Sequence, residues 1–503
     1  MARGKVWLVG AGPGDPGLIT ARGLELLRGA DVVLHDSLAH PSLLVEAHGE
    51  VRDVGKRYGV ESPTQSSINE QLVALARAGK RVVRLKGGDP FLFARGGEEA
   101  EALADAGIPF EVVPGVPSPV GAAAYAGMSL THRELSSSVT FITGSDRAGQ
   151  EWSPAAWQKL ATATDTICVL MGMRRLEEIL AAIVAGGRPG DTPAAVIQWG
   201  ARPEQRVVTA TLETLAPLAR TAGLSNPAII VVGEIVELRD RLRWYDSRPL
   251  FGKRVLVPRA AHQATVTAHA IRERAALPVL FPVIEIHDPP DVERLRRAAR
   301  AVEDYSWVVF TSVNGVERFF SALKDVGRDA RAFGRSRIAA IGPKTGDALE
   351  AHGLVADRVA EEFVGESLAA ALTAEGERGR VLIPRALVAR EELPAALRAA
   401  GFEVDVVPAY RTEPASSARA GELRRLLEEQ LVDVVLFTSG STVVSSCQLL
   451  GENAAKLLST ATVASIGPIT TRAAREHGIE PAVTASEFTV DGLLDALEAH
   501  LAG

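Results

Sequence analysis

Short apolar runs alternate along the whole chain with longer segments rich in Ala, Leu, Glu and Arg. Their near-continuous apolar character is typical of strands that are covered on both faces. The alternation predicts an α/β protein built from parallel sheets with helices packed on them. The runs lie at Val6–Val9, Val32–Leu34, Val82–Leu85, Ile229–Val232, Val255–Val257, Val308–Phe310 and Val434–Phe437.

A charged stretch at residues 237–254 interrupts this alternation. It lies between a strand that ends at Val236 and a strand that begins at Val255. Exposed, polar connections of this kind separate domains. We therefore predict one domain over residues 1–245 and a second over residues 246–503.

The second half contains an internal repeat. RVLVPRA at 254–260 returns as RVLIPRA at 380–386, Phe-Thr-Ser at 310–312 returns at 437–439, and Ile-Gly-Pro at 341–343 returns at 466–468. Three matches in one order, at offsets of 125 to 127 residues, predict two similarly folded lobes with a cleft between them.

Composition narrows the classes of function. The net charge of −7 gives no global basic field for nucleic acid. Two cysteines, Cys168 and Cys447, exclude a disulfide framework and a cysteine metal cluster. No apolar run is long enough to cross a membrane, and Met1–Lys5 leads directly into a strand without a signal peptide. We expect a cytoplasmic enzyme without a metal, and no membrane or nucleic-acid partner.

The first glycine-rich turn follows a strand and contains Gly12, Gly14 and Gly17, which satisfy the dinucleotide pattern G-x-G-x-x-G. However, Pro13 and Pro16 remove two backbone N–H donors that a pyrophosphate would need. A sulfonium nucleoside has no such need. We therefore favour that ligand over NAD, while a purely structural turn stays open.

A second block runs from Arg84 to Glu99. Gly87 and Gly88 follow a strand and would let a ligand approach the backbone closely. Asp89 comes next, where it could bind a ribose hydroxyl or an amino group. Glu98 and Glu99 are interpreted as a solvated helix start that complements the helix dipole.

With these motifs in order, residues 5–245 resemble the uroporphyrinogen-III C-methyltransferases of the tetrapyrrole methylase family. The resemblance rests on Gly-Pro-Gly-Asp at 12–15, Gly-Lys-Arg at 55–57, Arg-Leu-Lys-Gly-Gly-Asp-Pro at 84–90, Leu-Thr-His-Arg at 130–133 and Met-Gly at 171–172. It implies two α/β subdomains, at about 1–115 and 120–245, a homodimer, and S-adenosyl-L-methionine as methyl donor, with S-adenosyl-L-homocysteine as product.

The resemblance also implies site residues. Asp36 would be the proton acceptor and Lys56 the donor. The candidates to bind substrate carboxylates are Arg57, Arg84, Arg95, Arg133 and Arg147. The methyl donor would touch Pro13, Gly87, Gly88, Asp89, Leu92, Pro117, Ser118, Met171 and Gly200. The sequence departs from the family at His35, Ala94 and Ser145.

Residues 252–503 resemble the uroporphyrinogen-III synthases. The matching pieces are the repeated segments together with Ala-Tyr-Arg-Thr at 409–412. The resemblance implies two lobes, one at about 252–280 plus 412–503 and the other at about 284–408, joined by extended strands near 279–286 and 404–411. It implies Tyr410 as the residue that assists hydroxyl loss, and carboxylate binding by Thr311, Ser312, Thr438, Ser439 and Thr470.

Together the two resemblances imply a bifunctional enzyme of tetrapyrrole synthesis. The second half would cyclise hydroxymethylbilane to uroporphyrinogen III, and the first half would methylate this product to precorrin-2. The alternative is an active methyltransferase joined to a non-catalytic tetrapyrrole-binding or regulatory module.

Overall fold

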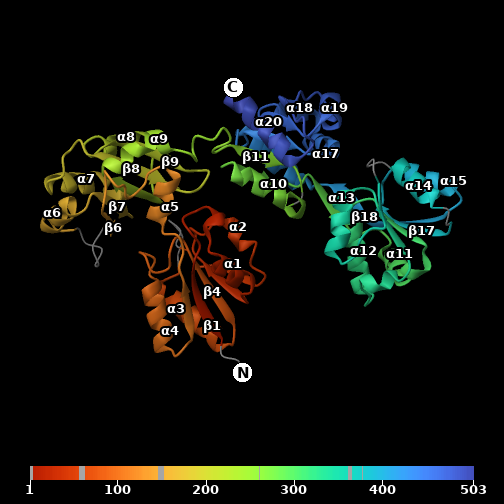
Figure 1. Ribbon diagram of the computed structural model, residues 1–503, viewed down its shortest axis with the longest axis horizontal. Coiled ribbons are helices and arrows are strands. Elements are labelled where there is room, and N and C mark those ends of the chain that lie inside the picture. The colour runs from red at the N-terminus through yellow and green to blue at the C-terminus, as the bar shows by residue number, and fades with distance from the viewer. Residues whose placement is uncertain (1–3, 56–62, 145–151, 260, 361–364, 376–377) are drawn as a thin grey trace. The chain divides into compact units, whose positions relative to one another are not determined.

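The structure is a computed structural model, and it describes residues 4–55, 63–144, 152–259, 261–360, 365–375 and 378–503 (Figure 1). The chain divides into two compact units. One contains Met1–Arg254, His269–Pro278 and Leu497–Gly503, and the other contains Val255–Ala268 and Val279–Ala496. Four sheets with packed helices confirm the α/β class. The limits of the predicted domains, subdomains and lobes stay predictions.

The first sheet is entirely parallel, as the apolar runs predicted. Its order is β3 (Glu50–Asp53), β2 (Val32–His35), β4 (Arg81–Lys86), β1 (Lys5–Gly10) and β5 (Phe110–Val113).

Alternate residues of these strands face different helices. Val9 and Val83 pack in one core with Leu27 of α1 (Ala21–Arg28). Leu8 and Val82 pack in the other core against α3 (Gln65–Arg77) and α4 (Gly96–Asp105), which lie side by side on the sheet (Figure 1). Because both faces are covered, the strands read as continuous apolar runs.

The second sheet is mixed, which corrects the expectation of parallel layers throughout. Its order is β6 (Val139–Thr143), β7 (Thr166–Leu170), β10 (Ala228–Val232), β8 (Pro193–Gln198) and β9 (Arg206–Thr211). Only β6 and β7 pair in parallel, and the other pairs are antiparallel. The short connection 199–205 between β8 and β9 explains part of this, because a parallel crossover needs a much longer segment.

The second half contains two further sheets. One has the order β12 (Leu277–Leu280), β11 (Arg254–Val257), β19 (Val434–Phe437), β20 (Thr462–Ser465) and β21 (Val483–Thr484). The other has the order β13 (Ile284–His287), β18 (Glu403–Pro414), β17 (Arg380–Ala386), β14 (Trp307–Phe310), β15 (Arg337–Ala340) and β16 (Arg358–Val359). The segments expected to be extended near 279–286 and 404–411 are β12, β13 and β18.

The repeated triplets begin helices in both places. Ser312 caps α12 (Val313–Asp325) and Ser439 caps α17 (Gly440–Leu450), each by accepting a bond from a backbone N–H of the first turn. α13 (Pro343–Ala351) and α19 (Pro468–Glu476) both begin with the proline of Ile-Gly-Pro. The repeat therefore encodes the same strand–helix junction twice.

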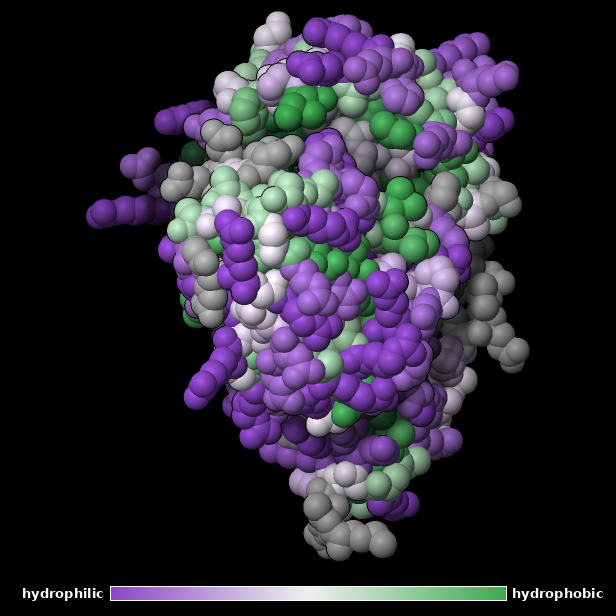
Figure 2. Space-filling view, turned by 90° about the vertical axis from the view of Figure 1, so that its right-hand side faces the viewer, coloured by the Kyte–Doolittle hydropathy of each residue, from purple (hydrophilic) through white to green (hydrophobic). Residues whose placement is uncertain are grey.

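Among the described residues, no helix combines the length and apolar character needed to span a membrane. The face drawn in Figure 2 is mainly hydrophilic, with apolar side chains scattered over it.

Candidate functional site

A cavity of about 330 Å³ lies where the first two sheets meet, within the first unit. Glycines and apolar side chains form most of its wall, and the size is ordinary for a small-molecule site. Seven of the nine residues predicted to touch a methyl donor line it: Pro13, Gly87, Gly88, Leu92, Ser118, Met171 and Gly200. These residues come from segments far apart in the chain and line one cavity, and their contact with a methyl donor stays a prediction.

The turn at 11–17 has few N–H donors to offer a ligand. The Gly12 N–H donates to the Gly88 carbonyl at 3.2 Å, and the Gly88 N–H donates back at 2.8 Å. The Gly17 N–H donates to the Asp15 carboxylate at 2.7 Å. A diphosphate would find few free amides and no α-helix start here, because Pro13 and Pro16 have no N–H, the Gly12 and Gly17 amides are already bonded, and α1 begins only at Ala21. The turn therefore fits a sulfonium nucleoside better than a dinucleotide.

Unusual backbone conformations concentrate around this cavity. Among the described residues, seven non-glycine positions have positive φ, and five of them lie at or beside the cavity wall. Left-handed conformations cost about 1–2 kcal/mol each in such residues, and they cluster at functional sites. The five are Phe93 (φ 54°), Arg95 (60°), Met171 (54°), Trp199 (50°) and Ala201 (60°). Met171, 60% exposed, is no core residue.

The other two predicted donor contacts, Asp89 and Pro117, support the wall rather than line it. The Asp89 carboxylate accepts bonds from the Phe91 N–H at 2.8 Å and the Gly115 N–H at 3.0 Å. Pro117 stands immediately before α5 (Ser118–Tyr125). Their contact with a ligand stays a prediction.

Asp36, the predicted proton acceptor, follows β2 and belongs to a buried group of charges. Its carboxylate accepts a bond from Arg84 Nη2 at 2.5 Å, and its side chain is 28% exposed. Arg84 in turn pairs with Glu99 at 3.1 Å, and Lys86 pairs with the same Glu99 oxygen at 2.9 Å. Two cations and two carboxylates thus share one apolar environment.

These contacts correct two interpretations. Glu99 is completely buried, so it is not part of a solvated helix start, whereas Glu98 is half exposed as expected. Arg84 is 2% exposed and already paired with Asp36 and Glu99, so it is not available to substrate carboxylates. Both side chains lie between β4 and α4, where an unpaired charge would be strongly unfavourable.

The charge balance shifts the pKa values of this group. Burial, and then Arg84, lower the pKa of Lys86. Burial alone would also lower the pKa of Arg84, but Asp36 and Glu99 outweigh it, so the net shift is upward.

The other predicted cationic residues differ in position. Arg95 precedes α4 and pairs with Glu98 at 3.1 Å, with both side chains about half exposed. Arg133 is exposed on the loop before β6. Lys56, Arg57, Ser145 and Arg147 lie outside the described residues. The roles of these residues stay predictions.

In the second unit, Tyr410 lies on β18 and is 7% exposed. Its hydroxyl is 3.1 Å from the Ser312 hydroxyl. Ser312 and Ser439 cap helices, and Thr311 and Thr438 precede these caps, half-buried. Thr470, only 4% exposed, has little access to a substrate. The structure therefore places Tyr410 and Ser312 together, and their chemistry stays a prediction.

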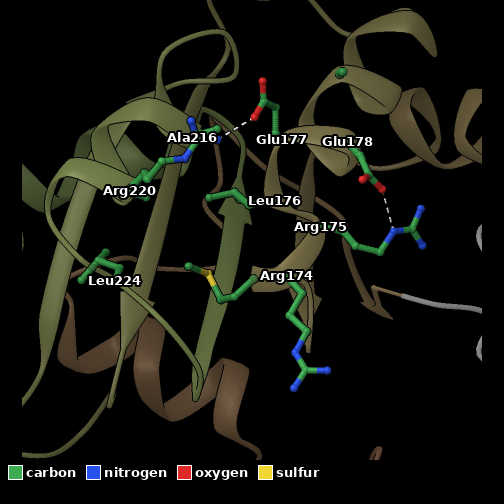
Figure 3. Close-up of a pocket in the computed structure, with 11 residues that line it drawn as sticks. Arg174, Arg175, Leu176, Glu177, Glu178, Ala216, Arg220 and Leu224 are labelled. Atoms are coloured by element: carbon green, nitrogen blue, oxygen red, sulfur yellow. Dashed lines mark hydrogen bonds and ion pairs between the residues drawn. The ribbon is translucent and has the colours of Figure 1, made fainter.

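A larger cavity of about 570 Å³ lies beside α7 (Leu176–Ala185) and α8 (Leu215–Thr221). In Figure 3, Arg175 reaches Glu178 and Arg220 reaches Glu177, at 2.8 Å and 2.7 Å. Such exposed pairs are ordinary surface interactions. None of the residues that line this larger cavity has a positive φ, unlike the wall of the smaller cavity, so the larger cavity is the weaker candidate.

Comparison with known proteins assigns each half of the chain. Residues 5–216 match the family of tetrapyrrole (corrin/porphyrin) methylases, and residues 265–495 match uroporphyrinogen-III synthase HemD. A siroheme synthase 2 from Halorhodospira halophila is 51% identical over 253 residues, which cover 49% of this chain and 50% of that protein.

Two solved structures each resemble one half. A uroporphyrin-III C-methyl transferase from Thermus thermophilus, complexed with S-adenosyl homocysteine, is 38% identical and covers 46% of this chain and 99% of its own, with a TM-score of 0.41. A mutant uroporphyrinogen III synthase from the same species is 22% identical and covers 50% of this chain and 99% of its own, with a TM-score of 0.39.

One relative spans both halves. The porphyrin biosynthesis protein HemD of Ruminiclostridium josui is 37% identical over 500 residues, which cover 99% of this chain and 98% of that protein. The chain belongs to this family, in which a tetrapyrrole methylase region is fused to a uroporphyrinogen-III synthase region.

Proposed function

We propose that the chain catalyses two consecutive steps of tetrapyrrole synthesis. The second half cyclises hydroxymethylbilane to uroporphyrinogen III with inversion of ring D. The first half methylates uroporphyrinogen III at carbons 2 and 7 to give precorrin-2. The observation that carries the proposal is the cavity of the first unit, which seven of the nine predicted donor contacts line.

S-adenosylmethionine, when bound, supplies an electrophilic methyl group on a sulfonium. Gly87, Gly88 and Met171 would hold it, since the two glycines allow close approach and Met171 projects from the end of β7. The electron-rich pyrrole carbon needs alignment more than activation, so the rigid wall acts mainly by proximity. Asp36, fixed by Arg84, would accept the proton that leaves the methylated ring.

In the second half, the proposed chemistry centres on Tyr410. Its hydroxyl would assist departure of the bilane hydroxyl, and Ser312, 3.1 Å away, fixes the orientation of the phenol. The capped starts of α12 and α17 present N–H groups that suit the carboxylates of the substrate. No redox step is involved.

One assay tests both activities. The full chain is incubated with hydroxymethylbilane and isotopically labelled S-adenosylmethionine, and the products are analysed for isomer and for methyl count. We expect a type III macrocycle with two labelled methyl groups. Methylation of added uroporphyrinogen III without formation of the type III isomer from the bilane would instead favour a non-catalytic second half. Absence of both products would refute the proposal.

A further inference from the structure

Arg202 was not among the residues singled out by sequence, yet it lines the donor cavity. It lies on the loop between β8 and β9. Its Nη2 donates to the Leu38 carbonyl at 2.5 Å, and its guanidinium lies 5.0 Å from the centre of the Trp199 ring. A side chain at Gly14 would come within 2.7 Å of Arg202 Cγ. The guanidinium is thus held by contacts with two segments far apart in the chain, at Leu38 and at Trp199.

This cation lacks a carboxylate partner. Within the described part of the chain, no Asp or Glu oxygen lies within 4.0 Å of the Arg202 guanidinium. Burial lowers the pKa of Arg202, and the exposed Glu204 partly opposes this shift. Burial and then Arg202 also lower the pKa of His40, to about 4, so the neighbouring imidazole carries no charge near pH 7.

Arg202 is half-buried, and charges that are withdrawn from water in proteins are normally paired. The Trp199 contact and one carbonyl bond use only part of a group with five N–H donors. The remaining donors have the planar fork geometry that matches a carboxylate. The described residues that line the cavity include no Asp or Glu, so the cavity offers a site for the anion of a ligand.

We propose that Arg202 is a specificity residue of the donor cavity and binds a carboxylate of a bound ligand. Two ligands of the proposed reaction carry this group: the amino-acid end of the methyl donor, and the acetate and propionate arms of the macrocycle. The inference rests on the proposed function, and the experiment below separates the two sources.

The test uses the full chain with Arg202→Gln, Arg202→Lys and the matched control Arg206→Gln. Arg206 lies on the same segment, is exposed, and donates to the Ala222 carbonyl outside the cavity. Calorimetry measures binding of S-adenosylhomocysteine and of its decarboxylated analogue, which keeps the nucleoside, thioether and amine. Steady-state methylation gives KM for uroporphyrinogen III.

If the donor supplies the carboxylate, Arg202→Gln weakens S-adenosylhomocysteine binding at least tenfold and changes binding of the decarboxylated analogue less than twofold. If the macrocycle supplies it, S-adenosylhomocysteine binding changes less than twofold and KM rises at least tenfold. In both cases Arg202→Lys should weaken binding less than Arg202→Gln does, and Arg206→Gln should bind like the parent chain.

Equal weakening of both nucleosides would show that Arg202 only shapes the cavity, and no change in binding or KM would show that it has no role. Either result overturns the inference. If the unaltered chain binds no S-adenosylhomocysteine at all, the proposed methyltransferase function fails instead, which is a distinguishable outcome.

Discussion

Replacing Glu99 by Gln should destabilise the first sheet far more than the same change at its neighbour Glu98. Glu99 is fully buried and accepts bonds from Arg84 at 3.1 Å, Lys86 at 2.9 Å and Gln65 at 3.2 Å. In Glu99→Gln the neutral amide leaves the two buried cations, Arg84 and Lys86, with the Asp36 carboxylate as the one remaining negative charge of this group. Removing one member of a buried ion pair typically costs about 3–5 kcal/mol.

Glu98→Gln is the matched control because it removes the same charge one residue away. Glu98 is 51% exposed and pairs with Arg95, which is 50% exposed. Exposed pairs contribute about 0–1 kcal/mol. The structure therefore predicts a difference of at least about 2 kcal/mol between two adjacent substitutions.

The assay must isolate the first sheet, because a chain with several units does not unfold as a two-state system. Hydrogen exchange of peptides from residues 5–113, measured across a urea series, gives the local unfolding free energy. With a urea dependence of about 1–3 kcal/mol/M, Glu99→Gln should lower the local midpoint by about 1 M or more. Equal midpoints for the two variants would refute the reasoning.

The Lys86 ammonium adds a pH dependence. Its pKa is lowered in the folded state, so the folded protein binds this proton less tightly than the unfolded chain. Stability contributed by this group therefore rises as pH increases through the lowered pKa towards the ordinary value of 10.5. Glu99 opposes this decrease in the pKa of Lys86. The loss of unfolding free energy caused by Glu99→Gln should therefore become smaller at alkaline pH, where Lys86 loses its charge. A loss that does not change with pH would contradict this account.

Three further outcomes are expected. His40 has a pKa of about 4 against an ordinary 6.5, chiefly through burial, so stability should fall by up to about 3 kcal/mol as pH drops from 6.5 to 4; acid unfolding of His40→Asn should lack this loss, and an unchanged slope would count against it. Met171→Gly relieves the strain of a φ of 54°, so the unfolding free energy should stay equal or rise by about 1 kcal/mol. The same variant should bind S-adenosylhomocysteine at least fivefold more weakly. Unchanged affinity in calorimetry would exclude a contact between Met171 and the donor. Tyr410→Phe should slow bilane cyclisation at least tenfold without affecting methylation, whereas Tyr305→Phe, which loses a bond to Asp405, should leave both rates near normal; equal effects on cyclisation would argue for a structural role.

The sequence was most informative where a pattern has a single structural solution. Apolar runs predicted strands, and the repeat marked the segments in which the structure has two similar strand–helix junctions. Most residues that line the smaller cavity were predicted from the resemblance to a known family, and their contact with a methyl donor stays a prediction. The expectation of parallel strands was wrong for the second sheet, where the hairpin of β8 and β9 reverses the strand direction.

The buried charges could have been predicted from two periodicities. Arg84 and Lys86 are two residues apart in a strand covered on both faces, so they share one side. Glu99 lies in the buried stripe of α4 with Gly96, Ala100 and Leu103. Positive φ at Trp199 and the position of Arg202 had no such signal, because side-chain periodicity does not encode loop conformation.

The interleaved strand order of the second half has a consequence for synthesis on the ribosome. Val255 of β11 pairs with Val434 of β19, which is translated about 180 residues later. At a translation rate of roughly 5–20 residues per second, β19 is synthesised on the order of ten to thirty seconds after β11. The intervening sheet, whose strands all lie between residues 284 and 414, is complete by then. Nascent chains arrested before residue 434 should therefore protect β14 and β17 from proteolysis while β11 stays accessible.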